Sequence, residues 1–314
     1  MRQCGYGERV RVVSLLPSAT EILCRVGGAS LLVGRSHECD FPLGLDHLPV
    51  LTGQRTPMLV GEGSSADIDR AVRAALGAGE SLYTLDVDQL RALKPDVILT
   101  QDLCEVCSID LQTVQAVARS MDPMPTVVSL DPKSIWAVFD DLLRVGAAVG
   151  LEREAEAAMV ELRERWWTAV DFVNPYEEGP EVLFLEWMNP TFVGGHWTPE
   201  LIRAAGARHS LNAAGFKSRV ASVEEIVAAA PDRVIICPCG LPLPAIEAEL
   251  PALLAERWWS VLPANLERGR VALVDGNQMF NRPGPRLVDA FRWMVGWLHD
   301  RPELIPHNFP VIYR

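Results

Sequence analysis

Two cysteines at a metal-ligand spacing follow a predicted buried strand. Cys104 and Cys107 are three positions apart and come shortly after the apolar run 97–99. Two thiols at this spacing can bind one transition metal, such as zinc, or form a disulfide. His37 and Cys39 lie in a polar loop after another apolar run. If both strands belong to one sheet, the two loops meet, and these four residues predict a Cys₃His metal site.

Two other interpretations of the thiols stay open. The cysteines can be small apolar residues of the core, or Cys104 and Cys107 can form a local disulfide. A redox function is less consistent with the sequence, because the carboxylates of Asp102 and Glu105 would raise the pKa of Cys104. The sequence contains no nucleophile elbow, no P-loop and no G-x-G-x-x-G motif, which favours a binding protein over an enzyme of those classes.

Aromatic and cationic residues in predicted loops suggest a second kind of site. Trp187, Trp197 and Phe280 can pack on a large flat ligand, or can instead fill an interface between lobes. Gly195 would let the backbone approach a ligand closely, and His196 after it is either a ligand contact or a structural residue. Arg282 and Arg286 can donate to carboxylates or amides of a ligand. Alternatively, they can form a salt bridge with Asp275 or Asp289.

The residues expected to bind a ligand share one property: they lie in loops that follow predicted strands. In open α/β sheets, ligands bind at the carboxyl ends of the strands. The expected ligand-binding residues are Pro17, Ser18, Glu38, Asp40, Gln101, Asp102, Trp187, Gly195, His196, Trp197, Asn277, Phe280 and Arg282.

The elements that position these loops alternate between strand and helix. Short apolar, β-branched runs such as 10–16 predict buried strands. Ser18 precedes Glu21 by three residues, which predicts a capping box at the start of a helix. Residues 152–167 contain no Pro or Gly and predict a long helix, which follows a helix ending at Gly150.

Two segments of the chain match in register. Residues 86–99 and 222–236 each contain a capping residue, a short helix, a Pro-Asp turn and a buried strand. A weaker pair, 21–27 and 200–206, occurs in the same order. The repeat predicts an α/β fold of two lobes: an N-terminal lobe over 1–132, a helical linker over 133–176 and a C-terminal lobe over 177–314. The cleft between such lobes is a preferred ligand site.

Composition restricts the partners. The chain has 314 residues and a formal net charge of −12, and its only lysines are Lys94, Lys133 and Lys217. An acidic surface argues against nucleic acid as a partner. No apolar run is long enough for membrane insertion, and residues 1–9 do not have the pattern of a signal peptide. The sequence therefore predicts a cytoplasmic protein, or a periplasmic one if a leader has been removed.

The sequence resembles the helical-backbone substrate-binding proteins of ABC importers. The resemblance covers nearly the whole chain and is carried by 14–22, 34–40, 94–99 and 281–286, of which the last three are similar to the cobalamin-binding branch. It implies two Rossmann-like lobes joined by a rigid connecting helix, a corrinoid, haem, siderophore or metal ion held in the cleft, and an ABC permease as partner.

Two hypotheses follow. In the first, the protein binds cobalamin between its lobes, and the thiols are dispensable for binding. In the second, it is a cytoplasmic metal-site protein or enzyme that uses His37, Cys39, Cys104 and Cys107.

Overall fold

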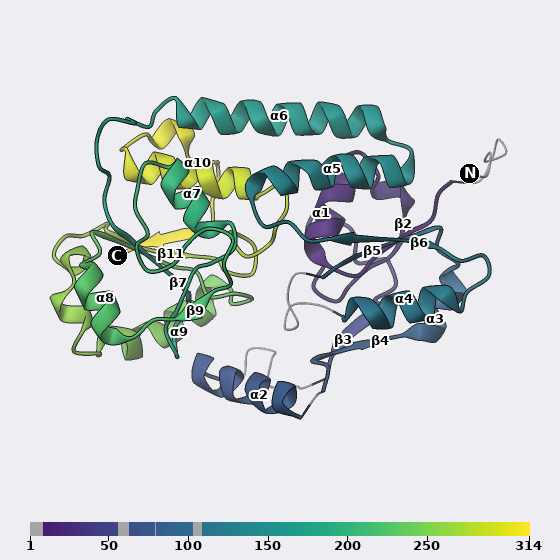
Figure 1. Cartoon of the computed structure of the whole chain (residues 1–314), viewed down its shortest axis with the longest axis horizontal. Coiled ribbons are helices and arrows are strands. Elements are labelled where there is room, and N and C mark those ends of the chain that lie inside the picture. The colour runs from purple at the N-terminus through teal and green to yellow at the C-terminus, as the bar shows by residue number, and fades with distance from the viewer. Residues whose placement is uncertain (1–8, 56–62, 79, 103–108) are drawn as a thin grey trace. The chain divides into compact units, whose positions relative to one another are not determined.

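The computed structural model describes residues 9–55, 63–78, 80–102 and 109–314, and its chain forms two compact units. The first unit contains residues 1–57, 72–132 and 136–160; the second contains 58–71, 133–135 and 161–314. The chain is therefore an α/β protein with two compact units, as the sequence predicts (Figure 1).

Strands and helices are interspersed along the described parts of the chain. Up to residue 170 they are β1 Val12–Ser14, α1 Pro17–Arg25, β2 Leu32–Gly34, β3 Thr52–Gln54, α2 Ser65–Gly77, β4 Tyr83–Leu85, α3 Val87–Leu93, β5 Val97–Gln101, α4 Leu111–Arg119, β6 Thr126–Leu130, α5 Ile135–Val149 and α6 Glu152–Val170. Beyond it they are β7 Val182–Trp187, β8 Phe192–Val193, α7 Thr198–Ala204, β9 Arg219–Val220, α8 Val223–Ala229, β10 Arg233–Ile236, α9 Leu243–Leu254, β11 Val271–Val274, α10 Leu287–Leu298 and β12 Val311–Tyr313.

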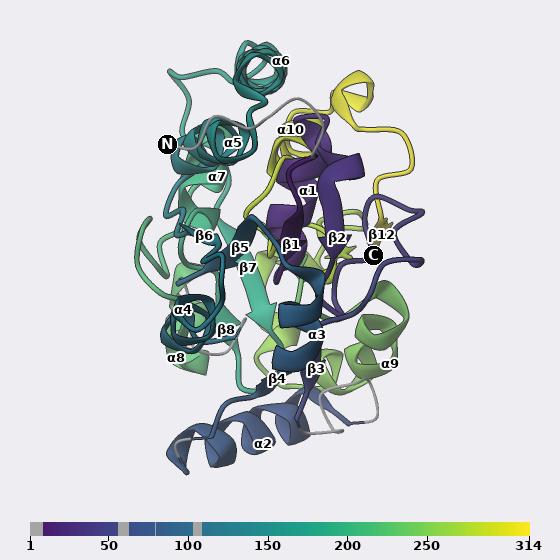
Figure 2. The same ribbon diagram turned by 90° about the vertical axis from the view of Figure 1, so that its right-hand side faces the viewer.

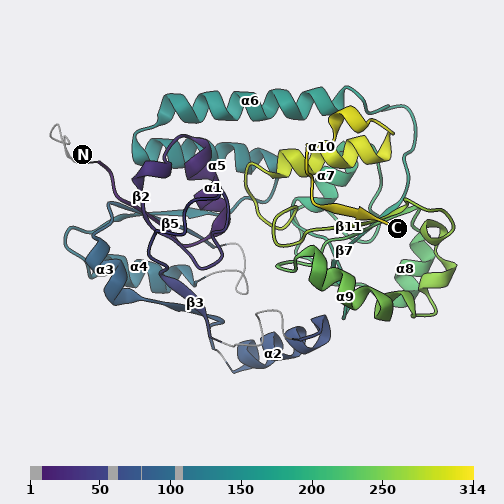
Figure 3. The ribbon, with the colours of Figure 1, turned by 180° about the vertical axis from the view of Figure 1, so that it is seen from behind.

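The first unit is built on a parallel sheet with the strand order β2-β1-β5-β6 (Figure 2). Every residue of β1 and β5 is buried, as expected for central strands of a parallel sheet. Helices α1 and α5 lie on one side of this sheet, and α3 and α4 lie on the other (Figures 1 and 3). The carboxyl ends of all four strands therefore lie along one edge.

The second unit has a mixed sheet with the order β12-β11-β10-β7-β8-β9. Its centre, β11-β10-β7, is parallel, and the outer pairs are antiparallel. Helices α7 and α10 cover one side and α8 and α9 the other (Figure 3). The core contains many aromatic residues: Trp166 of α6 stacks on Phe291 of α10 with ring centroids 3.6 Å apart.

The predicted repeat has equivalent geometry in the two units. Asp86 accepts a hydrogen bond from Gln89 N at the start of α3, and Ser222 forms a full capping box with Glu225 at the start of α8. Each helix then ends at a residue in the left-handed conformation, Lys94 (φ 43°) and Ala230 (φ 46°).

The predicted capping box at Ser18 is wrong. Helix α1 begins at Pro17, its N-cap is Leu16, and no side chain caps it. Proline at the first helical position already has a helical φ, and its missing N–H leaves one fewer donor to satisfy. Helix α7 also begins with a proline in its first turn and has no side-chain cap.

Two helices occupy the predicted linker. Helices α5 and α6 meet at Gly150, which has φ +75°. The compact units divide within α6, after Val160. Within the first unit the two helices approach closely at Gly146, where an added Cβ would lie 2.4 Å from the Cβ of Ala155.

Candidate ligand-binding loops

The loop after β2 is folded around one arginine. Arg35 donates from Nε to the carbonyl of Leu45 and from its terminal nitrogen to the carbonyls of Ser36 and Cys39. The Ser36 hydroxyl in turn accepts the N–H of Glu38 at 3.2 Å. These bonds hold residues 36–39 in a fixed turn at the carboxyl edge of the first sheet.

His37 faces a small pocket inside the first unit. Its Nδ1 lies 2.7 Å from Thr52 Oγ1, which also accepts the backbone N–H of His37. Its Nε2 is buried, has no hydrogen-bond partner among the described residues and lies 3.9 Å from a carboxylate oxygen of Glu38. Burial lowers the pKa of His37, so the neutral imidazole is favoured. The pocket is lined by Leu15, Ser36, His37, Glu38, Thr52, Tyr83 and Ile109.

Cys39 packs against helix α1. Its side chain is buried, and its sulfur lies 3.0 Å from Thr20 Oγ1. Burial, with the nearby Cys39 and Glu21, raises the pKa of Cys24 to about 11. Cys24 is therefore a poor metal ligand and a poor nucleophile at neutral pH, because the thiolate form that these roles require is scarce.

The structure brings together no cluster of three or more His, Cys, Asp or Glu side chains suited to a metal, within the parts of the chain that it describes. Two of the four predicted ligands, Cys104 and Cys107, lie outside those parts. The Cys₃His site therefore stays a prediction. His37 bonds to Thr52 and Cys39 to Thr20, so each of these two residues has its own local partner.

The other predicted residues of the first unit lie at the expected edge. Pro17 and Ser18 form the first turn of α1, after β1, and Ser18 is buried. Gln101 ends β5 and is also buried, whereas Asp102 after it is exposed. Asp40 is exposed in the loop after β2.

Trp197 and Phe280 pack inside the second unit. Trp197 donates from Nε1 to the carbonyl of Phe280 at 2.7 Å, and both side chains are buried. The ring of Phe280 lies edge-on to Phe184 and to Trp293, with centroids 5.2 and 5.9 Å away. In this structure the two aromatic side chains therefore present almost no surface to a ligand, and their role as ligand contacts stays a prediction.

Trp187 has a polar partner from a distant part of the sequence. Its Nε1 donates to the carbonyl of Ser65, at the start of α2, at 3.0 Å. Ser65 belongs to the second unit, although the strands before and after it in the sequence, β3 and β4, belong to the first. No feature of the sequence around Trp187 or Ser65 indicated this contact.

The loop after β11 is built on its own polar side chains. Asp275 accepts backbone N–H groups of Asn277, Gln278 and Leu243. Asn281 donates to the carbonyls of Cys237 and Gly276 and so joins this loop to the end of β10.

The two arginines of this loop are buried and have partners within it. Arg282 donates to Asn277 Oδ1, and Arg286 donates to Gln278 Oε1. The second predicted partner, Asp289, pairs instead with Arg165 of α6.

Gly195 and His196 contact the loop 211–218. An added Cβ on Gly195 would lie 2.4 Å from Ser218 N and 2.5 Å from the Phe216 carbonyl, so only glycine fits. His196 has φ +53°; its N–H donates to the carbonyl of Phe216, and its carbonyl accepts the N–H of Gly215.

Glu186, near the end of β7, is a residue that the sequence did not single out. The Ser218 hydroxyl lies 2.7 Å from both of its carboxylate oxygens and also accepts the N–H of Gly195 at 3.1 Å. Burial raises the pKa of Glu186, although the contacts with Ser218 and Gly195 act in the opposite direction. A glutamate inside an otherwise apolar strand was the available signal, because such a group must be hydrogen-bonded.

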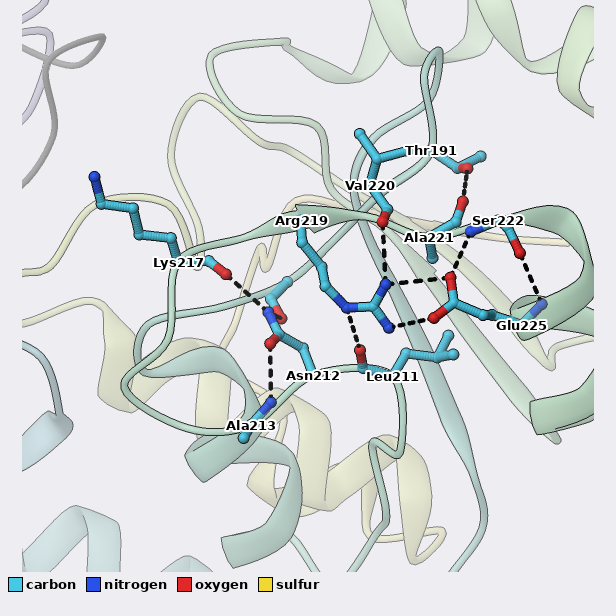
Figure 4. Close-up of polar contacts among 11 residues, drawn as sticks. Thr191, Leu211, Asn212, Ala213, Lys217, Arg219, Val220, Ala221, Ser222 and Glu225 are labelled. Atoms are coloured by element: carbon cyan, nitrogen blue, oxygen red, sulfur yellow. Dashed lines mark hydrogen bonds and ion pairs between the residues drawn. The ribbon is translucent and has the colours of Figure 1, made fainter.

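Arg219 fixes both ends of the same loop (Figure 4). Its guanidinium donates to the carbonyls of Leu211 and Val220 and to both carboxylate oxygens of Glu225. Asn212 adds a bond to the carbonyl of Lys217, whose side chain extends away from these contacts.

Comparison with known proteins identifies the family. Residues 12–275 match the model of the periplasmic binding protein family, so the chain belongs to this family. None of the curated proteins matches the sequence significantly.

Several solved structures have the same fold. A periplasmic heme-binding protein from Pseudomonas aeruginosa has 23% identity and a TM-score of 0.69, with 96% of this chain and 95% of the other covered. The periplasmic heme-binding protein RhuT of Roseiflexus sp. RS-1 has 21% identity, a TM-score of 0.70 and coverages of 94% and 99%. The periplasmic vitamin B12 binding protein BtuF of Vibrio cholerae has 16% identity, a TM-score of 0.65 and coverages of 93% and 98%.

No helix in the described ranges is both long enough and apolar enough to cross a bilayer.

Proposed function

We propose that this protein is a substrate-binding protein of an ABC import system and that its ligand is a cobalamin-type corrinoid. The family supports the first part, and the names of its structural relatives leave haem and vitamin B12 as the ligands to compare. The choice between them rests on the charge of the loops at the carboxyl ends of the strands.

Those loops are rich in carboxylates. Glu38 and Asp40 follow β2 and Asp102 follows β5, and the side chains of Asp40 and Asp102 are exposed. Haem carries two propionates and needs cations, whereas the corrin periphery of cobalamin carries amides that donate to carboxylates. The single observation that carries the proposal is this acidic character.

Cations near the same loops are engaged elsewhere. Arg35 bonds to the carbonyls of its own turn, Arg219 to Glu225, and Arg282 to Asn277. A propionate would have to compete with these partners, at the cost of unpairing them.

Titration with two ligands tests the proposal. Tryptophan fluorescence and absorbance of the purified chain would be followed on addition of cyanocobalamin and, separately, hemin. We expect saturable binding of cyanocobalamin and at least about tenfold weaker binding of hemin, a difference of about 1.4 kcal/mol. Tighter binding of hemin, or no response to cyanocobalamin, would contradict it.

A matched pair of variants tests the role of charge. The double variant Asp40→Asn, Asp102→Asn should bind cyanocobalamin more weakly. Asp88→Asn, at an exposed position of α3, removes charge away from the strand ends and should bind as the wild type does.

The cytoplasmic location that the sequence predicts stays a prediction, as does an ABC permease as the particular partner.

A further inference from the structure

The imidazole of His37 has one nitrogen that no described residue satisfies. Its Nε2 is buried from solvent and has no hydrogen-bond partner among the described residues. Buried polar atoms in folded proteins are nearly always bonded to protein, to water or to an ion. The position of Nε2 therefore indicates an occupant in the space beside it.

The space beside His37 is a small pocket in the first unit. The described residues that line it all belong to that unit, and they include imidazole, carboxylate, phenol and hydroxyl groups. Its volume of about 10 Å³ is room for one water-sized group. A macrocycle does not fit, so the occupant is a single ion or a single water molecule.

The other nitrogen of the imidazole is held in the way that metal-binding histidines are held. Thr52 Oγ1 lies 2.7 Å from Nδ1 and 3.1 Å from the backbone nitrogen of His37. A hydroxyl oxygen has two lone pairs, so Thr52 can accept both N–H groups. With the proton on Nδ1, Nε2 keeps a free lone pair, which is the form of histidine that binds a metal. Burial lowers the pKa of His37, which favours this neutral form.

Glu38 supplies a charged oxygen donor next to this nitrogen. One of its carboxylate oxygens lies 3.9 Å from His37 Nε2, which is too far for a hydrogen bond. Two ligands of a tetrahedral zinc ion lie about 3.4 Å apart, because each is about 2.0–2.2 Å from the metal. A shift of about half an ångström in the half-buried side chain of Glu38 brings both atoms to one ion.

The groups around the pocket are held by ordered backbone. Thr52 of β3 and Tyr83 of β4 lie on paired strands, and the ring of Tyr83 lies 5.7 Å from that of His37. The turn that carries His37 and Glu38 is fixed by the bonds that Arg35 donates. An ion would therefore meet groups that are already in place.

The neighbouring thiol does not belong to this site. Cys39 is buried, and its sulfur lies 3.0 Å from Thr20 Oγ1 of α1. The donors among the described lining residues are nitrogen and oxygen. Imidazole and carboxylate ligands suit zinc and other divalent transition metals.

We propose that this pocket binds one divalent transition-metal ion, with His37 Nε2 and the Glu38 carboxylate as its ligands. Thr52 orients the imidazole, Tyr83 lines the pocket from β4, and water fills the remaining coordination positions. Binding of the ion does not require that the protein binds a corrinoid, so this proposal and the proposed function succeed or fail separately.

Zinc titration of chelator-treated protein tests the site, with calorimetry and elemental analysis after dialysis as readouts. His37→Ala should weaken Zn²⁺ binding at least about hundredfold, and Thr52→Val, which removes only the supporting contact, about tenfold to hundredfold. His47→Ala removes an exposed histidine from the same part of the chain and should bind as the wild type does. Absence of zinc binding by the wild type, or unchanged affinity in His37→Ala, would overturn the proposal and leave the pocket to water.

Glu38→Gln keeps the size of the side chain and should weaken Zn²⁺ binding about tenfold or more. Circular dichroism shows whether each variant is folded. If His37→Ala does not fold, the result for Glu38→Gln decides: unchanged affinity in that variant would overturn Glu38 as a ligand.

Cobalt(II) substitution in the wild type tests the ligand set without any variant. Co²⁺ bound by nitrogen and oxygen should show d–d absorption without the near-ultraviolet charge-transfer band of a thiolate ligand. The double variant Cys104→Ser, Cys107→Ser should retain the ion. A thiolate band on the bound cobalt, or loss of zinc from the double variant, would overturn the site in favour of the cysteines.

Discussion

Asp96 and Asp232 have equivalent roles in the two units. The Asp96 carboxylate accepts the N–H of Arg11 at 2.8 Å, and the Asp232 carboxylate accepts the N–H of Glu181 at 2.9 Å. In each case the backbone N–H of the aspartate bonds to the carbonyl of that same partner residue. The aspartate of each Pro-Asp turn is therefore bonded to the residue that directly precedes the neighbouring strand, Arg11 before β1 and Glu181 before β7.

Removing these carboxylates should destabilise the protein unequally. Asp232→Ala leaves the N–H of Glu181, a buried residue, without a partner, and we expect a loss of about 1–3 kcal/mol in the free energy of unfolding. Asp96→Ala should cost less, because Arg11 is exposed and water can replace the carboxylate. Urea unfolding of both variants measures the difference. An equal loss of stability in the two variants would show that the burial of Glu181 and the exposure of Arg11 do not determine the size of the loss.

The repeat explains how much of the fold the sequence predicts. A capping residue, an apolar stripe, a Pro-Asp turn and a β-branched run are all local signals, and both copies of this pattern fold as predicted. The start of α1 was mispredicted because Ser18 and Pro17 give competing local signals, and the proline prevails.

The candidate site was less predictable because its contacts are non-local. Trp187 bonds to Ser65 and Trp197 to Phe280, and nothing near either tryptophan in the sequence marks its partner. Loop position left two interpretations open for Trp197 and Phe280, contact with a ligand or packing at an interface, and both side chains are buried in the structure. Strand ends were predictable, whereas the direction of each side chain depends on packing that only the folded chain provides.

Gly146 should be intolerant of even a methyl group. Its position lies where α5 meets α6, and a Cβ would approach the Cβ of Ala155 to 2.4 Å and the carbonyl of Leu151 to 3.0 Å. Gly146→Ala should lower the free energy of unfolding by about 1–3 kcal/mol despite the better helix propensity of alanine. Thermal and urea unfolding measure the change.

Gly77 at the end of α2 is the matched control, because nothing lies within 4 Å of the Cβ it would gain. Gly77→Ala should be neutral or slightly stabilising. A Gly146→Ala variant that is as stable as Gly77→Ala would show that the two helices can separate without cost.

Asp141 should make the protein less stable as the pH rises. Burial raises its pKa from 3.8 to about 6, although Arg144 acts in the opposite direction. Between these values the unfolded chain ionises while the folded one stays protonated, so stability falls from pH 3.8 upward and the full cost is present above pH 6. Asp141→Asn should therefore be more stable than the wild type at pH 7, by about 2–3 kcal/mol at most, and equal to it near pH 3.8. Urea unfolding of both proteins between pH 3.8 and pH 7 measures the difference in stability. A difference that does not change with pH would contradict a raised pKa of Asp141 as its cause.

Titration of His209 should make the protein less stable as the pH falls, the opposite of the effect of Asp141. The side chain of His209 is half-buried, and its Nδ1 lies 2.8 Å from the carbonyl of Val182. Burial lowers its pKa below 6.5, so its contribution to stability is complete above pH 6.5 and is lost as the pH falls through the lowered folded-state pKa. His209→Gln should lose stability at neutral pH, and its stability should decline less than that of the wild type as the pH falls below 6.5. Exposed His307→Gln is the control and should retain the wild-type profile; the same decline in all three proteins would exclude His209 as its cause.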